Sequence, residues 1–151
     1  MHIELETPDQ PEVAALLAQL RALHMALYPA SRHSPLPLAA LQQPEVRFLR
    51  FLVARDDAGR AAGCIALKRH AGYGEVKCMV VDAAARGQGI GHALLDQLAL
   101  HALAAGVHEL KLTTGTRQVE AIALYERFGF VRCAPYAGAI GEDDICMEKH
   151  L

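Results

Sequence analysis

Three glycines at alternate positions carry the clearest chemical meaning in this sequence. Gly87, Gly89 and Gly91 lie within the segment Arg86 to Gly91, between an apolar run that ends near Val81 and a helical pattern. Glycine lets the backbone approach a ligand closely, and the first turn of a helix presents unpaired N–H groups with partial positive charge. The segment therefore predicts a site for an anionic group such as a pyrophosphate. A tight strand-to-helix turn without a ligand is the alternative.

The residue types at fixed positions exclude two other phosphate-binding motifs. A Walker loop needs Gly-Lys followed by Ser or Thr, whereas Gly91 is followed by His92. A dinucleotide fingerprint needs Gly-x-Gly-x-x-Gly, and its third glycine would fall on His92 or Leu94. The pattern that fits is Gln/Arg-x-x-Gly-x-Gly/Ala, with Arg86, Gly89 and Gly91 at its fixed positions.

A second pattern follows one predicted helix and one predicted strand later. Residues 118–130 read Gln-Val-Glu-Ala-Ile-Ala-Leu-Tyr-Glu-Arg-Phe-Gly-Phe. Together with the glycine segment, they resemble the two signatures of the GNAT superfamily of N-acetyltransferases, of which the second reads Asn-x-x-Ala-x-x-Leu-Tyr-x-x-x-Gly-Phe. The order is that of the family, and the resemblance covers about residues 46 to 134. Gln118 stands where the family often has Asn, and it keeps the amide on a longer stem.

The resemblance implies acetyl-coenzyme A as the co-substrate. In the family, the pantetheine arm lies between two splayed strands and pairs with backbone groups at positions that match Met79 to Val81, while amides of the glycine segment hold the pyrophosphate. The predicted cofactor-binding residues are accordingly Met79, Val80, Val81, Arg86, Gly87, Gln88, Gly89, Ile90, Gly91, His92 and Gln118. Read without the resemblance, Met79 to Val81 are simply buried strand. The histidines do not have metal-ligand spacing, so no metal is expected.

Tyr125 is the residue that the resemblance assigns to the leaving group. The family commonly has a tyrosine here beside the coenzyme A sulfur, where it would return a proton to the thiolate. Tyr125 also lies on an apolar stripe with Ala121, Leu124 and Phe128. Its alternative role is therefore that of a core residue.

Glu75 is the predicted general base, acting directly or through a water molecule. Acetyl transfer requires the acceptor amine, with a pKa of about 10 if lysine-like, to lose its proton. Glu75 begins the run that ends at Val81, and some GNAT histone acetyltransferases place their catalytic glutamate similarly. Burial in a cleft wall would raise the pKa of this carboxyl, which suits a base. The alternative for Glu75 is a surface glutamate paired with Lys77. The oxyanion of the tetrahedral intermediate would be bound by a backbone N–H such as that of Val81.

Hydrophobic periodicity predicts the elements that must position these residues. A helix begins with Thr7 as N-cap and Pro8 as its first residue, and a proline-rich break at 28–37 ends it. Strands are expected at 2–6, 46–54, 60–69, 73–81, 108–113, 130–134 and 144–149, and helices at 8–27, 38–43, 89–105 and 118–128. The order βααβββαβαββ predicts an α/β fold, a mixed sheet with helices on its faces, in a single domain over residues 1–151. The resemblance identifies it as the GNAT acyl-CoA N-acyltransferase fold.

Composition limits the classes of function. The 151 residues are 52% hydrophobic, which suffices for one core, and the net charge of −2 without a dense basic cluster disfavours a nucleic-acid partner. The absence of a long apolar run argues against a membrane span. The N-terminus has no export signal and the four scattered cysteines read as reduced thiols, so a cytoplasmic location is expected.

These features predict an N-acetyltransferase that moves the acetyl group of acetyl-coenzyme A directly to a primary amine of a small or amino-acid-like molecule. Two alternatives stay open: a protein N-acetyltransferase, and a non-catalytic acyl-coenzyme A sensing module that would need neither Glu75 nor Tyr125. The acceptor's identity, the role of residues 28–37 and the oligomeric state, a homodimer included, are undecided. Groups that could meet a charged acceptor are Arg32, His33, Arg47, Glu142, Asp143 and Asp144.

Overall fold

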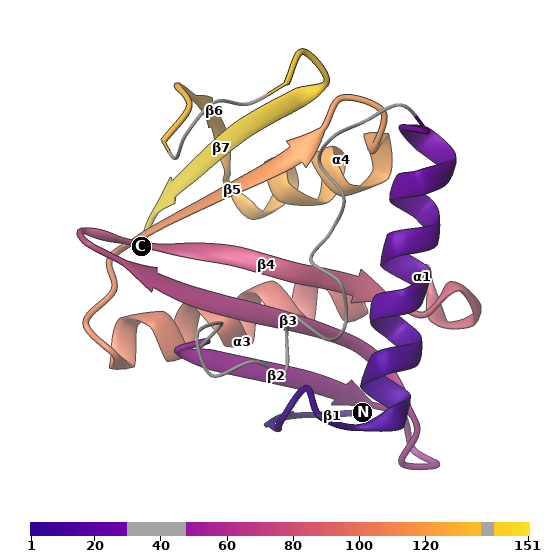
Figure 1. Cartoon of the computed structure of the whole chain (residues 1–151). Coiled ribbons are helices and arrows are strands. Elements are labelled where there is room, and N and C mark those ends of the chain that lie inside the picture. Colours follow the sequence, from indigo (N-terminus) through magenta and orange to yellow (C-terminus); the bar gives the residue numbers. More distant parts are fainter. Residues whose placement is uncertain (30–47, 137–140) are drawn as a thin grey trace.

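Seven strands form one mixed sheet in the computed structural model, which describes residues 1–29, 48–136 and 141–151 (Figure 1). Their order across the sheet is β1-β2-β3-β4-β5-β7-β6. Only β4 and β5 pair in parallel, and every other neighbouring pair is antiparallel. The strands are β1 (His2–Leu5), β2 (Arg50–Arg55), β3 (Ala61–His70), β4 (Tyr73–Val81), β5 (Glu109–Gly115), β6 (Val131–Cys133) and β7 (Asp144–His150).

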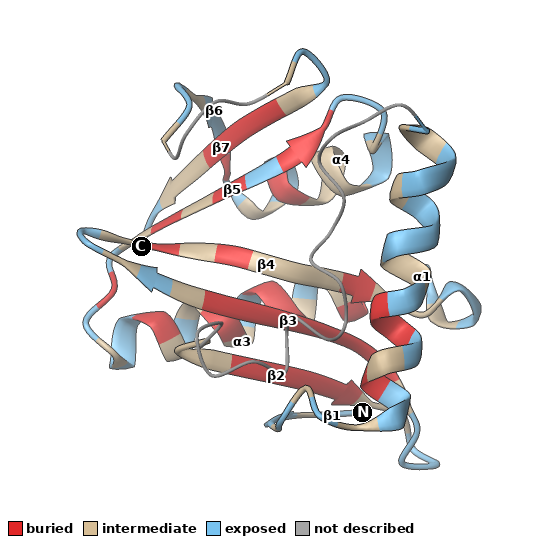
Figure 2. Ribbon diagram, in the orientation of Figure 1, coloured by how far each residue is buried: buried red, intermediate tan, exposed pale blue. Residues whose placement is uncertain are grey.

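Helices lie on both faces of this sheet. α3 (Ile90–Ala104) and α4 (Val119–Phe128) lie on one face, and α1 (Pro11–Leu27) crosses the other (Figure 1). Each face has its own apolar cluster (Figure 2). Burial of each leucine or valine in such a cluster contributes about 1.5–3 kcal/mol. Within the described ranges, no helix combines the length and the apolar character that crossing a membrane requires.

The α/β fold expected from the sequence is confirmed, with two corrections at local level. α1 begins at Pro11 rather than Pro8, so the predicted Thr7 N-cap is wrong. The Thr7 hydroxyl instead accepts a hydrogen bond from the N–H of Asp9, and Pro11 takes the first helical position, where a missing N–H costs nothing. A short 3-10 turn, η1 (Ala83–Ala85), was not predicted. The proposed helix at 38–43 lies outside the described residues.

The sheet opens between its two parallel strands. β4 and β5 pair only at Gly74 with Leu110 and at Glu75 with Lys111. Beyond these pairs the strands part, and we call the resulting gap between residues 76–81 of β4 and 112–115 of β5 the fork. This splaying agrees with the expectation from the sequence.

A β-bulge in β4 adjoins the fork. Cys78 and Met79 together stand opposite one residue of β3, and Cys78 has a φ of +55°. A bulge re-aims the residues that follow it and takes their main-chain groups out of the regular ladder. This bulge was not predictable, because a cysteine does not normally mark a left-handed conformation.

Candidate active site

The glycine segment forms the loop that leads from η1 into α3. Gly87 and Gly89 both have a φ of +79°, which glycine adopts without strain, and Gly89 is the N-cap of α3. Gly91 lies in the first turn, where a Cβ would come within 2.8 Å of Leu124 and 3.1 Å of Met79. The alternating glycines therefore meet two different needs, namely backbone conformation at 87 and 89 and close helix packing at 91. We call residues 86–91 the anion loop.

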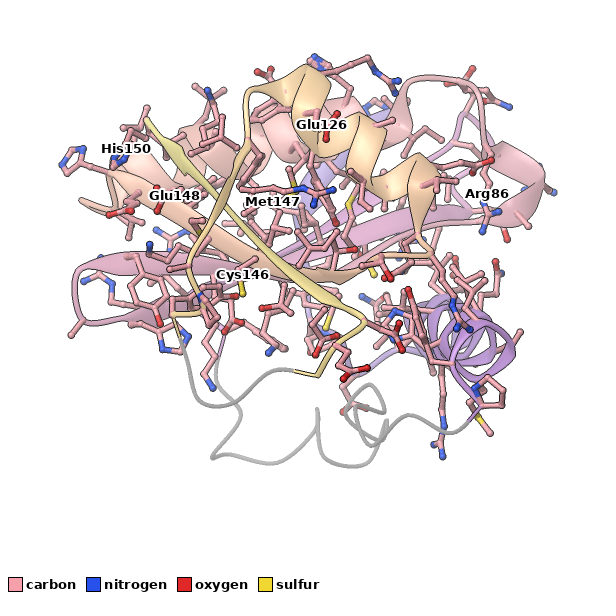
Figure 3. The ribbon with its side chains drawn as sticks, turned by 90° about the horizontal axis from the view of Figure 1, so that it is seen from above. Arg86, Glu126, Cys146, Met147, Glu148 and His150 are labelled. Atoms are coloured by element: carbon pink, nitrogen blue, oxygen red, sulfur yellow. The ribbon has the colours of Figure 1, made fainter. Side chains whose placement is uncertain are left out.

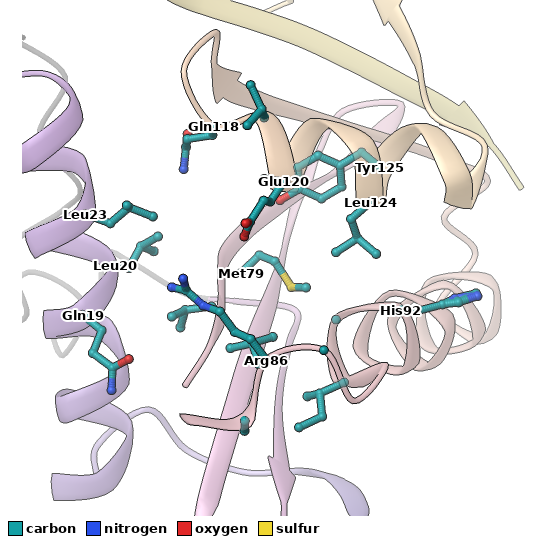
Figure 4. A pocket seen from close by; sticks show the side chains of 18 of the residues that line it. Gln19, Leu20, Leu23, Met79, Arg86, His92, Gln118, Glu120, Leu124 and Tyr125 are labelled. Atoms are coloured by element: carbon teal, nitrogen blue, oxygen red, sulfur yellow. The ribbon is translucent and has the colours of Figure 1, made fainter. Parts of the chain in front are cut away.

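A cavity of about 770 Å³ lies between α1, the end of β4, the anion loop and α4 (Figure 4). Its wall includes ten of the eleven predicted cofactor-binding residues: Met79, Val80, Val81, Arg86, Gly87, Gly89, Ile90, Gly91, His92 and Gln118. Gln88 is exposed and does not line it. The N–H groups of the first α3 turn have no partner within the helix, so this end of the cavity suits an anion.

Tyr125 is a core residue whose hydroxyl also reaches the cavity. Its ring is buried and packs edge-on against Phe130, with ring centroids 5.7 Å apart. Its hydroxyl points into the cavity (Figure 4). Burial raises the pKa of Tyr125 to about 12, so the phenol stays protonated at neutral pH. The ring is part of the core, and the hydroxyl is available as a proton donor.

Gln118 is held by groups of the protein itself. Its Oε1 accepts hydrogen bonds from the Thr114 hydroxyl at 3.1 Å and the Gly115 N–H at 2.9 Å. Its Nε2 lies 3.2 Å from Nε2 of His24 on α1. Burial lowers the pKa of His24, which favours the neutral ring that can accept from this amide. The side chain predicted to contact the cofactor therefore also ties α4 to α1.

The C-terminal half of α1 forms a wall of the cavity. Leu20, Leu23 and Leu27 line it, and Leu23 is 36% exposed. Next to them, the Arg117 N–H donates to the Tyr28 hydroxyl at 2.7 Å, and the Arg117 guanidinium donates to the Leu27 carbonyl at 2.6 Å. The helix therefore bridges from the sheet to the start of α4. In the sequence these leucines continue the helical spacing of Val13, Leu16 and Leu17, and periodicity does not distinguish a core from an apolar cavity wall.

Glu75 lies outside the cavity wall, on the sheet face that carries α1. Val76 packs on the α3 side, so the neighbouring Glu75 points to the opposite face, where its side chain is 12% exposed. Its Oε1 is 2.9 Å from Nε2 of His70, its Oε2 accepts from the Tyr136 hydroxyl at 2.9 Å, and the Lys77 ammonium is 3.7 Å away.

The pKa of Glu75 is shifted in the opposite direction from the one expected. Burial by itself raises the pKa of Glu75, but the charge of Lys77 and the hydrogen bonds from His70 and Tyr136 outweigh it. The pKa of Glu75 consequently lies below its usual value of 4.5, and the expected rise is wrong. His70 and Tyr136 were not singled out from the sequence, because neither belongs to a local pattern with Glu75.

A second charged cluster lies next to Glu75 on this face, across β5 and β7. Glu109, Glu148 and His150 bring their potential ligand atoms within 4.8 Å of one another. The Lys111 ammonium lies 2.8 Å from Glu148 and 3.2 Å from Glu109, so it already balances the carboxylates. Glu148 and His150 also lie at the opposite end of the molecule from Arg86 (Figure 3). Arg32, His33 and Arg47, considered above for the acceptor, lie outside the described residues.

Known proteins share both the sequence pattern and the architecture. A family model described as an acetyltransferase (GNAT) domain matches residues 47–132. An IAA acetyltransferase of Azospirillum brasilense is 42% identical, over 99% of this chain and 97% of that protein. An acyl-CoA N-acyltransferase structure from Klebsiella pneumoniae is 32% identical, with a TM-score of 0.83 over 99% of this chain and 97% of that one. A GNAT family acetyltransferase from Elizabethkingia anophelis with acetyl-CoA bound shares the fold at 21% identity, with a TM-score of 0.72 over 99% and 97% of the two chains.

Proposed function

The chain belongs to the GNAT acetyltransferase family, and from this premise we propose that it moves the acetyl group of acetyl-coenzyme A directly to a primary amine of a small or amino-acid-like molecule. The family uses acetyl-coenzyme A for N-acetyl transfer. The observation that carries the finer proposal is the cavity, which joins the anion loop to the hydroxyl of Tyr125. The 42% identity to an IAA acetyltransferase, over almost the whole of both chains, supports a small acceptor rather than a protein segment.

We propose that the anion loop binds the pyrophosphate of coenzyme A. The first turn of α3 supplies unpaired N–H groups, and Gly87 and Gly89 leave them uncovered by side chains. The pantetheine arm would follow Met79 to Val81 toward the fork, where the β4 ladder is interrupted by the bulge. Gln118, at the start of α4, would border the arm from the other side.

Two side chains are proposed to handle the protons. Glu75 is ionised at neutral pH and accepts the proton that the acceptor ammonium must lose before it attacks the thioester. A backbone N–H such as that of Val81 stabilises the oxyanion. Tyr125, kept protonated by burial, donates to the departing thiolate. A non-catalytic acyl-coenzyme A sensor would need the anion loop but neither of these two groups.

A panel of amines tests the proposed function. Thiol release from acetyl-coenzyme A is measured with alkylamines, aromatic amines, amino acids, and peptides with free N-termini or lysines. We expect release with a subset of the small amines, accompanied by N-acetylated product in the mass spectrum. Release with peptides alone would identify a protein acetyltransferase instead. Binding of acetyl-coenzyme A without release on any amine would favour the sensing module.

A further inference from the structure

Two hydroxyl groups link Glu75 to the fork. The Thr113 hydroxyl donates to the Tyr136 oxygen at 3.0 Å, and the Tyr136 hydroxyl donates to Oε2 of Glu75 at 2.9 Å. Both bonds have the same polarity, with each donor pointing toward the carboxylate. A hydrogen-bonded chain that ends on an anion in this way is set to carry a proton toward that anion.

The outer end of this chain lies at the mouth of the fork. β4 and β5 pair for the last time at Glu75 and Lys111, and Thr113 is two residues further along β5 on the same face. Thr113 is exposed, whereas Glu75 is largely covered by His70 and Tyr136. A molecule that approaches the fork on this face can therefore contact the Thr113 hydroxyl, while the carboxylate of Glu75 lies behind it.

We propose that Thr113 and Tyr136 form a proton relay that carries the proton of the acceptor ammonium from the fork to Glu75, a step that rests on the proposed transfer to an amine. Thr113 contacts the acceptor directly. Tyr136 passes the proton from Thr113 to Glu75 and does not contact the acceptor. The relay extends the reach of the covered Glu75 carboxylate to the exposed Thr113 hydroxyl at the fork, which like Glu75 lies outside the cavity wall.

The transfer is balanced at each atom. The ammonium gives a proton to Oγ1 of Thr113, the hydroxyl proton of Thr113 passes to the Tyr136 oxygen, and the proton of Tyr136 passes to Oε2 of Glu75. The products are a neutral amine, a neutral carboxylic acid and two unchanged hydroxyls. Burial raises the pKa of Tyr136, which disfavours a free phenolate during the transfer. Glu75 later releases its proton to solvent.

Two acceptors that differ in charge distinguish a proton relay from a loss of side-chain packing in the variants. An alkylamine is protonated near pH 7 and needs the relay, whereas an aromatic amine is uncharged there and does not. The variants are Thr113→Val and Tyr136→Phe, which remove one hydroxyl each, and Thr113→Ser, which keeps it. Tyr73→Phe is the matched control, because the Tyr73 ring packs edge-on against Tyr136 at 5.4 Å and its hydroxyl is not part of the chain.

For both amines, kcat/KM is measured from the release of the coenzyme A thiol. With the alkylamine, we expect Thr113→Val and Tyr136→Phe to lose about 10²-fold or more, the contribution of a general base, and to change less than about threefold with the aromatic amine. Thr113→Ser and Tyr73→Phe should stay close to wild type with both. Equal losses with both amines, or no loss with either, would overturn the relay while leaving acetyl transfer intact. No release by the wild type with any amine would overturn the proposed function and the relay with it.

Discussion

Replacement of Tyr125 with phenylalanine is expected to lower kcat about 10²-fold or more, the contribution of a positioned proton donor. The dissociation constant for acetyl-coenzyme A should change little, because the phenylalanine ring keeps the edge-on packing against Phe130. Only the hydroxyl in the cavity is lost, and with it the proton for the leaving thiolate. Turnover is measured by thiol release, and affinity by calorimetric titration.

Tyr73→Phe provides the matched control for this loss. It removes a phenol from the sheet face opposite α4, and Tyr73 does not line the cavity. Its turnover should equal that of the wild type. Equal turnover of wild type and Tyr125→Phe would remove Tyr125 from the chemistry and leave it as a core residue. Loss of acetyl-coenzyme A binding in Tyr125→Phe would instead point to a role in binding.

Replacement of Glu75 with glutamine is expected to lower kcat/KM for an alkylamine about 10²–10³-fold at neutral pH, since a general base is removed. The pKa of Glu75 lies below 4.5, so the wild-type carboxylate is ionised throughout the neutral range. The amine itself loses its proton only near pH 10. The difference between wild type and variant should therefore be large at neutral pH and shrink as the pH rises toward 10.

Glu109→Gln is the control for a change of charge on the same face. Glu109 forms an ion pair with Lys111 and takes no part in the hydrogen bonds of Glu75, so this variant should keep the wild-type pH–rate profile. His70, Tyr136 and Lys77 face Glu75, and Tyr73 and Lys111 lie next to it on β4 and β5. All five groups are the same in both variants. A Glu75→Gln loss that stays constant from neutral pH to pH 10, or an unchanged acidic limb, would remove Glu75 from the mechanism.

The anion loop was predictable from the sequence because its requirements are local. A left-handed φ at positions 87 and 89 favours glycine whatever the rest of the chain does, and only the close packing of Gly91 involves residues of other elements. The position of Tyr125 in the cavity wall was predictable for a related reason, since it lies in a short signature on one helix. The strands and helices around them follow from apolar periodicity and turn residues, which are also properties of neighbouring residues.

The surroundings of Glu75 were predictable only in part. Its pairing with Lys77, which lowers its pKa most, was a local alternative in the sequence. Its contacts with His70, across the β3–β4 hairpin, and with Tyr136, 61 residues away, depend on the fold and have no sequence signal. The contact between His24 and Gln118 spans 94 residues and has no sequence signal. The Thr7 N-cap failed because Pro11 competes as the first helical residue, and local propensity does not decide between the two.

The affinity of Gly89→Ala for acetyl-coenzyme A, measured beside Gly59→Ala, tests the central claim that the anion loop holds the cofactor. Both glycines have a positive φ, +79° and +82°, and a Cβ at either would meet nothing within 4 Å. Each substitution should therefore cost a similar amount of stability, about 1–2 kcal/mol.

Only Gly89 lies in the cavity wall, so only its substitution should misdirect the N–H groups at the start of α3. We expect Gly89→Ala to weaken the binding of acetyl-coenzyme A about tenfold or more, the loss of one hydrogen bond to a charged group. Gly59→Ala should bind like the wild type. Equal affinities in the two variants would contradict the account.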